Sequence, residues 1–509
     1  MTPVRWDPAE DHPTRADAPS TRRHSFSQGV TYTGAGTALN IIFLFLETMV
    51  AVRVLNTETY GVYALLAVVV NFLVMVTDVG STTSVTQLIA SSHTSRQATL
   101  VGSAIIFRFA VVAFVSVVIL SLRQTAMFLL DPTMALLAYA VYIPMMLLAV
   151  SLDEALQAIL QGYQAFHHMA IANGLRTILR LALSVAFMLI LHLGIKGLIY
   201  SWVISFSAAV IYEYCVLPQR GRLLFNWQIL GEMLRFGFPL QINRFLWFVS
   251  ARVDILLLGI FLGPSFVALF EVGGRIPNAL VRLTQSYSAV YFPTMTELLS
   301  KGEKYRAHRL LNRSLRLLSF FMALSALISV VFGHQIIRIL FSAKYDFSSS
   351  VFSLLMIGLQ MNVLVTLMGY TLTSAGYPGR SLATNALREA LIVVADLLLI
   401  PLLGLIGPAC GKLIAYYFAN PLSVWMLRRS HIRVMMAPYM KQTALLWAGV
   451  ILFWWLKPQG GGIPMLIIIA FFVLNISFST ISRDDVTLVL PTSFAKWLSR
   501  RKEIISHAQ

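Results

Sequence analysis

The chain has 509 residues, of which 57% are hydrophobic and 12% charged, and its formal net charge is +17. Soluble domains carry about 45–50% apolar and about 25% charged residues, so this composition excludes a soluble globular protein and indicates a polytopic membrane protein. Lysine and arginine collect in the cytoplasmic loops of membrane proteins, so the positive charge predicts a topology and not a nucleic-acid partner. Cys215 and Cys410 lie in apolar segments, which indicates buried thiols, without a disulfide framework or a metal site.

Residues 1–28 are polar and contain four prolines, which predicts a disordered cytoplasmic tail and not a signal peptide. A spanning helix needs about 20 mostly apolar residues. Fourteen segments meet this requirement: 30–54, 60–79, 99–121, 133–156, 172–193, 197–217, 236–262, 265–294, 314–333, 349–373, 382–403, 405–427, 442–457 and 463–481.

The basic residues predict the orientation of these segments. With the N-terminus inside, 26 of the 39 lysines and arginines fall on the inner side, six on the outer side and seven within the spans. This asymmetry predicts a multi-pass membrane protein with both termini in the cytoplasm. The longest inner loop, 300–316, is predicted to form a basic amphipathic helix at the lipid surface.

Two stretches of the chain resemble each other. Residues 173–197 and 385–407 each begin with N-x-L-R, continue as one apolar helix and end in L-G-x-x-G. The offset is 212 residues at the start and 210 at the end, which predicts a repeat of six helices in parallel orientation. In chain order, the predicted segments of the protein are a tail (1–28), an N-lobe (29–217), a cytoplasmic linker (218–235), a C-lobe (236–428), two extra helices (429–481) and a cytoplasmic tail (482–509).

Several motifs resemble a known superfamily by their order and spacing. They are RVLNTETYGVYAL (53–65), TDVG (77–80), FGFPLQINRFLWFVSARVDILLLGIFLGPSFVALFEVGGRI (236–276), FGHQIIRILFSAKY (332–345) and LLIPLLGLIGPACG (398–411). This pattern is similar to polysaccharide exporters and lipid-linked oligosaccharide flippases of the multidrug/oligosaccharidyl-lipid/polysaccharide exporter superfamily. The resemblance implies an all-α fold with two six-helix lobes around a central cavity. It also implies alternating access and a polyprenyl-diphosphate-linked sugar as cargo.

Arginines within the predicted spans are candidates for binding that cargo. An arginine at the bilayer centre costs at least about 2.5–3.5 kcal/mol, so it should line an aqueous cavity or be paired. A guanidinium binds phosphate oxygens in a bidentate manner, as a diphosphate requires. The candidates are Arg108, Arg244, Arg252, Arg275 and Arg282. Local pairing is the alternative, with Glu271 close to Arg275, and with Asp254 facing Arg108 or Arg275.

Four acidic residues on the predicted spans are candidates for coupling or counter-ion roles. They are Asp254, Glu47, Asp396 and Glu271. Their carboxylates are candidates for binding a transported proton or sodium ion, and no other cofactor is predicted.

The predicted function is a flippase of the bacterial inner membrane that moves lipid-linked oligosaccharide to the outer leaflet for O-antigen, capsule or exopolysaccharide synthesis. Its predicted partners are this cargo, membrane lipids and a polysaccharide polymerase complex. The alternatives are a peptidoglycan-precursor flippase, a multidrug exporter of the same superfamily, or a membrane-embedded polymerase or ligase. No enzymatic activity is predicted, because the outer loops are short and no nucleophile or phosphate-cradling motif is present in the sequence.

Overall fold

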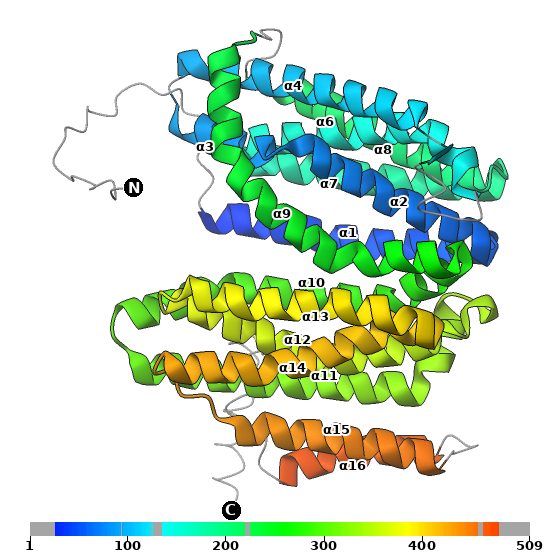
Figure 1. Cartoon of the computed structure of the whole chain (residues 1–509), viewed down its shortest axis with the longest axis vertical. Coiled ribbons are helices and arrows are strands. Elements are labelled where there is room, and N and C mark those ends of the chain that lie inside the picture. Colours follow the sequence, from blue (N-terminus) through cyan, green and yellow to red (C-terminus); the bar gives the residue numbers. More distant parts are fainter. Residues whose placement is uncertain are drawn as a thin grey trace, which may run out of the picture.

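The computed structural model describes residues 26–92, 94–122, 124–125, 135–218, 224–456 and 462–477, which are largely helical (Figure 1). The expected C-terminal tail, 482–509, and residues 1–25 of the expected N-terminal tail lie outside them. The helices are α1 Phe26–Val54, α2 Thr57–Asp78, α3 Ser81–Ser91, α4 Thr94–Ser121, η1 Ala135–Tyr142, α6 Ile143–Gly162, α7 Phe166–Val185, η2 Ala186–Ile190, α8 Ile195–Val216, α9 Trp227–Leu262, α10 Pro264–Ser300, α11 Lys304–Leu340, η3 Ala343–Tyr345, α12 Ser348–Ser374, α13 Pro378–Leu403, η4 Gly404–Ile406, α14 Gly407–Arg429, α15 Met436–Leu456 and α16 Gly462–Ser477.

Each of the fourteen predicted spans overlaps one of these helices, and residues 133–134, 457 and 478–481 of three spans lie outside the described part of the chain. Within the described part of the chain, eight helical stretches are long and apolar enough to cross a membrane, judged by length and composition alone. Two predictions need correction. The second span ends as predicted, where Val79 and Gly80 take positive φ angles of 47° and 79°, but a separate helix that was not predicted, α3, follows it. The basic segment 300–316 is helical, but most of it forms the first turns of α11 and is continuous with the following span.

The helices form two lobes joined by α9 (Figure 1). The first lobe contains α1 to α8, and the second contains α10 to α14. Helices α15 and α16 pack on α11, at the side of the second lobe away from the first (Figure 1). This arrangement agrees with the predicted all-α fold of two six-helix lobes and two additional C-terminal helices.

Helix α9 belongs to both lobes. Its N-terminal half packs against α2, α3 and α4, and its C-terminal half packs against α10 and α13. The side chain of Asn226 caps the helix by accepting hydrogen bonds from the backbone N–H groups of Gln228 and Ile229. Gln241 then donates to the carbonyl of Met75 at 2.6 Å. The expected linker, 218–235, therefore contains the first turns of α9, and the boundary between the lobes falls inside this helix.

The internal repeat has matching backbone geometry in both lobes. Gly194, before α8, has φ 56° and ψ −131°, and Gly404, after α13, has φ 61° and ψ −130°. Glycine is required here because a Cβ would make this conformation strained. Arg176 of α7 contacts Asp153 of α6, while the Nη1 atom of Arg388 in α13 lies 3.4 Å from the side-chain oxygen of Asn362 in α12. The two copies of N-x-L-R thus occupy equivalent places.

The lobes are in direct contact at the end of the molecule that the basic residues predict to be the outer side. Gly61 of α2 lies so close to α10 that a Cβ there would be 1.8 Å from the carbonyl oxygen of Pro264. Arg53 donates to the carbonyl of Ile339 at 2.7 Å. These contacts, together with the packing of α2 on α10, close this end of the space between the lobes.

Candidate functional site

A cavity of about 260 Å³ lies between the two lobes. It is lined by side chains from α1, α2, α7 and α8 of the first lobe and from α9 and α10 around the lobe boundary. The charged residues that line it are five arginines and two glutamates: Arg176, Arg180, Arg252, Arg275, Arg282, Glu47 and Glu271. The surplus of guanidinium groups makes the cavity electropositive, and the low-dielectric surroundings strengthen its attraction for an anion.

The arginines of α9 and α10 are only partly neutralised. Arg275 lies 3.3 Å from Glu271 and donates to the hydroxyl of Tyr60 at 3.0 Å. Arg252 lies 3.7 Å from the same glutamate, which is longer than a hydrogen bond. Among the described residues, the guanidinium of Arg282 makes no ion pair or hydrogen bond. Three predicted site residues therefore line one wall of the cavity, and the one carboxylate on this wall, Glu271, lies close to only two of them.

The opposite wall contains two arginines of α7 that the sequence analysis did not select. Arg180 donates from Nε to Glu47 at 3.0 Å and from Nη2 to the Tyr63 hydroxyl at 2.8 Å, and it lies 4.6 Å above the ring of Trp202. Arg176 contacts Asp153 and lies 4.7 Å above the Phe206 ring. The two arginines are four residues apart and hence on one helix face. This spacing could have identified the pair, but Arg176 lies at the inner end of its predicted span, where the charge distribution predicts an inner-side residue.

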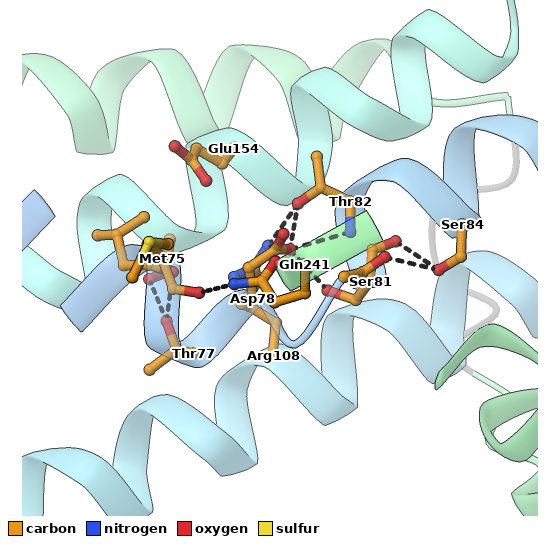
Figure 2. Close-up of polar contacts among 12 residues, drawn as sticks. Met75, Thr77, Asp78, Ser81, Thr82, Ser84, Arg108, Glu154 and Gln241 are labelled. Carbon is orange, nitrogen blue, oxygen red and sulfur yellow. Dashed lines mark hydrogen bonds and ion pairs between the residues drawn. The ribbon is translucent and has the colours of Figure 1, made fainter. Parts of the chain in front are cut away.

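Two of the predicted cargo ligands, Arg108 and Arg244, are not among the residues lining this cavity. Figure 2 shows Arg108 and Asp78 at the junction of α2 and α3, with Thr82 close to both. The Nη2 atom of Arg108 lies 2.5 Å from Asp78 Oδ1 and 2.7 Å from Thr82 Oγ1, and this arginine is completely buried. Arg244 donates from Nη1 to Asp78 Oδ2 at 2.7 Å and from Nη2 to Glu154 at 2.8 Å. In this conformation both guanidinium groups are paired with protein carboxylates. Asp78, the last residue of α2, lies between them and contacts one arginine with each carboxyl oxygen.

Replacing Asp78 with alanine is expected to destabilise the protein strongly. The change leaves the buried Arg108 without its counter-ion, and breaking a buried pair in this way costs roughly 3–5 kcal/mol. We expect a clear fall in the midpoint of thermal unfolding of the purified protein in detergent. The matched control is Glu232→Ala, which removes the exposed partner of Arg96 and should change stability by less than about 1 kcal/mol. Equal midpoints for the two variants would contradict a structural role for Asp78.

The four acidic candidates occupy two kinds of place. Glu47 and Glu271 line the main cavity as partners of arginines. Asp254 is buried and pairs with Lys412 at 2.5 Å, so its expected pairing with Arg108 or Arg275 is wrong. Asp396 is also buried, and neither of its carboxyl oxygens has a hydrogen-bond partner among the described residues. A smaller cavity of about 60 Å³, lined by Asp254, Lys412 and Glu271, adjoins this part of the second lobe.

Comparisons with known proteins agree with this architecture. The family model described as "Polysaccharide biosynthesis protein" matches residues 50–350, which is more than half of the chain. A Haloferax volcanii protein named "Probable flippase AglR" is 26% identical over 247 residues, which are 46% of this chain and 46% of the relative. The matches span less than half the length of the curated relatives.

Solved structures share the fold over most of the chain. A structure of the lipid II flippase MurJ in an inward closed conformation has a TM-score of 0.68 at 13% identity and covers 89% of this chain and 98% of its own. An inward-facing multidrug resistance transporter of the MATE family has a TM-score of 0.66 at 15% identity, covering 79% and 98%. The chain therefore belongs to the family described as "Polysaccharide biosynthesis protein".

Proposed function

We propose that the protein moves polyprenyl-diphosphate-linked oligosaccharide from the inner to the outer leaflet of a bacterial cytoplasmic membrane, for the synthesis of a surface polysaccharide. The observation that carries this proposal is the charge of the cavity between the lobes, where five arginines face two glutamates. A pocket for cationic drugs would need the opposite balance. Family membership supports a flippase or exporter, and the cavity charge supports an anionic cargo.

The cavity has groups suited to both parts of such a head group. Arg282 and Arg252 are available for bidentate binding of phosphate oxygens, since neither is held in a close ion pair by the described residues. Asn40, Asn71 and the indole of Trp202 also line the cavity and offer polar groups to sugar hydroxyls. A volume of about 260 Å³ suits the diphosphate and the adjoining sugar, with the remaining sugars and the polyprenyl chain outside it.

The contacts between the lobes support alternating access. Gly61 against Pro264 and Arg53 against Ile339 close the predicted outer end, so cargo enters this conformation from the inner side. Parting these contacts while the inner ends approach each other would expose the same arginines to the outer leaflet.

The test is a transport assay with the purified protein in vesicles of anionic and zwitterionic phospholipid. We expect the protein to translocate a fluorescent polyprenyl-diphosphate-linked oligosaccharide, read out by enzymatic access to the sugar on the far side. Undecaprenyl-diphosphate-linked muropeptide (lipid II) and a cationic dye serve as competing cargoes. Preference for lipid II would favour the peptidoglycan-precursor alternative, which the MurJ-like fold supports. Transport of the dye alone would contradict an anionic cargo.

A further inference from the structure

The first lobe contains a cluster of polar side chains that form hydrogen bonds with one another. Glu47 of α1 accepts hydrogen bonds on Oε1 from Arg180 Nε and from the Ser184 hydroxyl, both at 3.0 Å. The hydroxyls of Ser184 and Ser201 lie 2.7 Å apart. The cluster contains one positive and one negative group, so it is neutral without any additional ion.

The internal repeat relates this cluster to a second one in the other lobe. The offset of 212 residues that relates Arg176 to Arg388 also relates Ser184 to Asp396. The offset of 210 residues that relates Gly197 to Gly407 also relates Ser201 to Gly411. Each cluster also contains one acidic residue from the last third of a helix, Glu47 from α1 and Asp254 from α9. The second lobe thus has an aspartate where the first has a serine.

The second cluster contains an acid that the packing leaves without a partner. Lys412 of α14 donates to Asp254 Oδ2 at 2.5 Å, and the backbone N–H of Ile255 donates to the other oxygen at 2.9 Å. Asp396 of α13 is completely buried, and neither of its oxygens has a hydrogen-bond partner among the described residues. A Cβ on Gly411 would lie 2.9 Å from Asp396 Oδ1, so the carboxyl occupies the space that a serine at this position would need.

The charges of this second cluster do not balance if both acids are ionised. The charged groups that act on Asp396 are Asp254, from α9, and Lys412, from α14. The third helix packed against α13, α12, contributes the amide of Asn362 to the adjoining cavity, and α14 contributes the phenol of Tyr416. One ammonium faces two carboxyl groups, and a buried carboxylate without donors is strongly disfavoured. A single proton on Asp396 makes the cluster neutral, like its counterpart in the first lobe.

We propose that Asp396 is a proton-binding site of the second lobe. Its carboxylate binds one proton to form the neutral acid, and no other bond is made or broken. Sodium is not the ligand, because the ammonium of Lys412 already occupies the cation position beside Asp254. Release of the proton requires Lys412 to approach both carboxylates, and therefore requires α13 and α14 to shift. A role for this proton in coupling transport to a proton gradient rests on the proposed function. Proton binding by Asp396 does not.

The test is infrared spectroscopy of the purified full-length protein in detergent without cargo. We expect a carboxylic-acid C=O absorption at neutral pH that shifts in deuterium oxide and that is lost in both Asp396→Asn and Asp396→Ser. The serine variant introduces the residue that the first lobe has at the equivalent position, Ser184. It allows the same measurement if the asparagine variant does not fold. The matched control is Glu213→Gln, which removes another buried acid with an unpartnered oxygen and should keep the Asp396 absorption.

Unchanged spectra in both Asp396 variants would overturn the proposal, since Asp396 would then be ionised. Loss of the absorption when sodium chloride replaces choline chloride at constant pH would overturn the exclusion of sodium. Since no cargo is present, neither result depends on the proposed function. In vesicles, an imposed pH gradient should accelerate transport by the wild-type protein and not by Asp396→Ser. Equal acceleration of the two would overturn a coupling role for the bound proton.

Discussion

Replacing Arg282 with alanine is expected to reduce transport of lipid-linked oligosaccharide by roughly 10- to 100-fold while leaving the stability of the protein nearly unchanged. A hydrogen bond to a charged group contributes about 1.5–3 kcal/mol, which corresponds to this range. Stability should be preserved because the described residues give this guanidinium no ion pair to lose. The measurement is the initial rate of transport in vesicles, at matched amounts of reconstituted protein, together with the midpoint of thermal unfolding.

Arg252→Ala should behave in a similar way, since its contact with Glu271 is long at 3.7 Å. Replacement of either arginine by lysine should restore the charge but not the bidentate geometry, and hence recover transport only in part. The matched control is Arg306→Ala, at an exposed ion pair with Glu303 outside the cavity. Wild-type rates in Arg252→Ala, Arg282→Ala and the double variant would refute an anion-binding role for this wall of the cavity.

Replacing Gly61 with valine is expected to open the predicted outer end of the protein. Even the Cβ atom would lie 1.8 Å from the carbonyl oxygen of Pro264, so α2 and α10 must separate. Overpacking of this kind costs about 1–3 kcal/mol, enough to change the ratio of two conformations by about 5- to 150-fold. The measurement uses a cysteine-free background with Ser348, a buried residue at this end, replaced by cysteine. Labelling of that cysteine by a membrane-impermeant thiol reagent added outside should increase.

The control for this experiment is Gly174→Ala, because a Cβ at Gly174 meets no atom within 4 Å. Labelling in the control should match that of the parent protein. If Gly61→Val also labels like the parent, the contact between α2 and α10 does not hold the outer end closed. Labelling only from the inner side would reverse the predicted orientation of the chain.

Much of the fold could be predicted because its signals are local. Spans of about 20 apolar residues identify the helices, and the N-x-L-R and L-G-x-x-G motifs identify the repeat. Helix α3 was not predicted, because its sequence of mostly serine, threonine and glutamine is too polar for a span and resembles a loop. The connection between α10 and α11 is shorter than the predicted inner loop, 300–316, because α11 already begins at Lys304. Basic residues on the first turns of a helix resemble a loop in the sequence. In both places, polar or basic residues form helix outside the apolar segment that hydropathy identifies as the span.

The candidate site could be predicted only in part, for a different reason. Arg252, Arg275 and Arg282 stand out as charges within long apolar segments, and all three line the cavity. Arg108 stands out equally, yet its partner Asp78 is distant in sequence and meets it only through tertiary packing. Intramembrane charge therefore indicates that a partner exists, but not whether that partner is protein or cargo. The choice depends on helix packing that is not local in sequence.

The division of α9 between the lobes has a consequence for folding. The N-terminal half of this helix contributes Ile229 and Met233 to the core of the first lobe, while its C-terminal half contributes Ile255 and Leu258 to a core that includes the second. Loss of either lobe would expose apolar surface of a helix that the other lobe needs. The two halves of the repeat are thus not independent folding units, and unfolding that begins in one lobe spreads to the other through a single continuous helix.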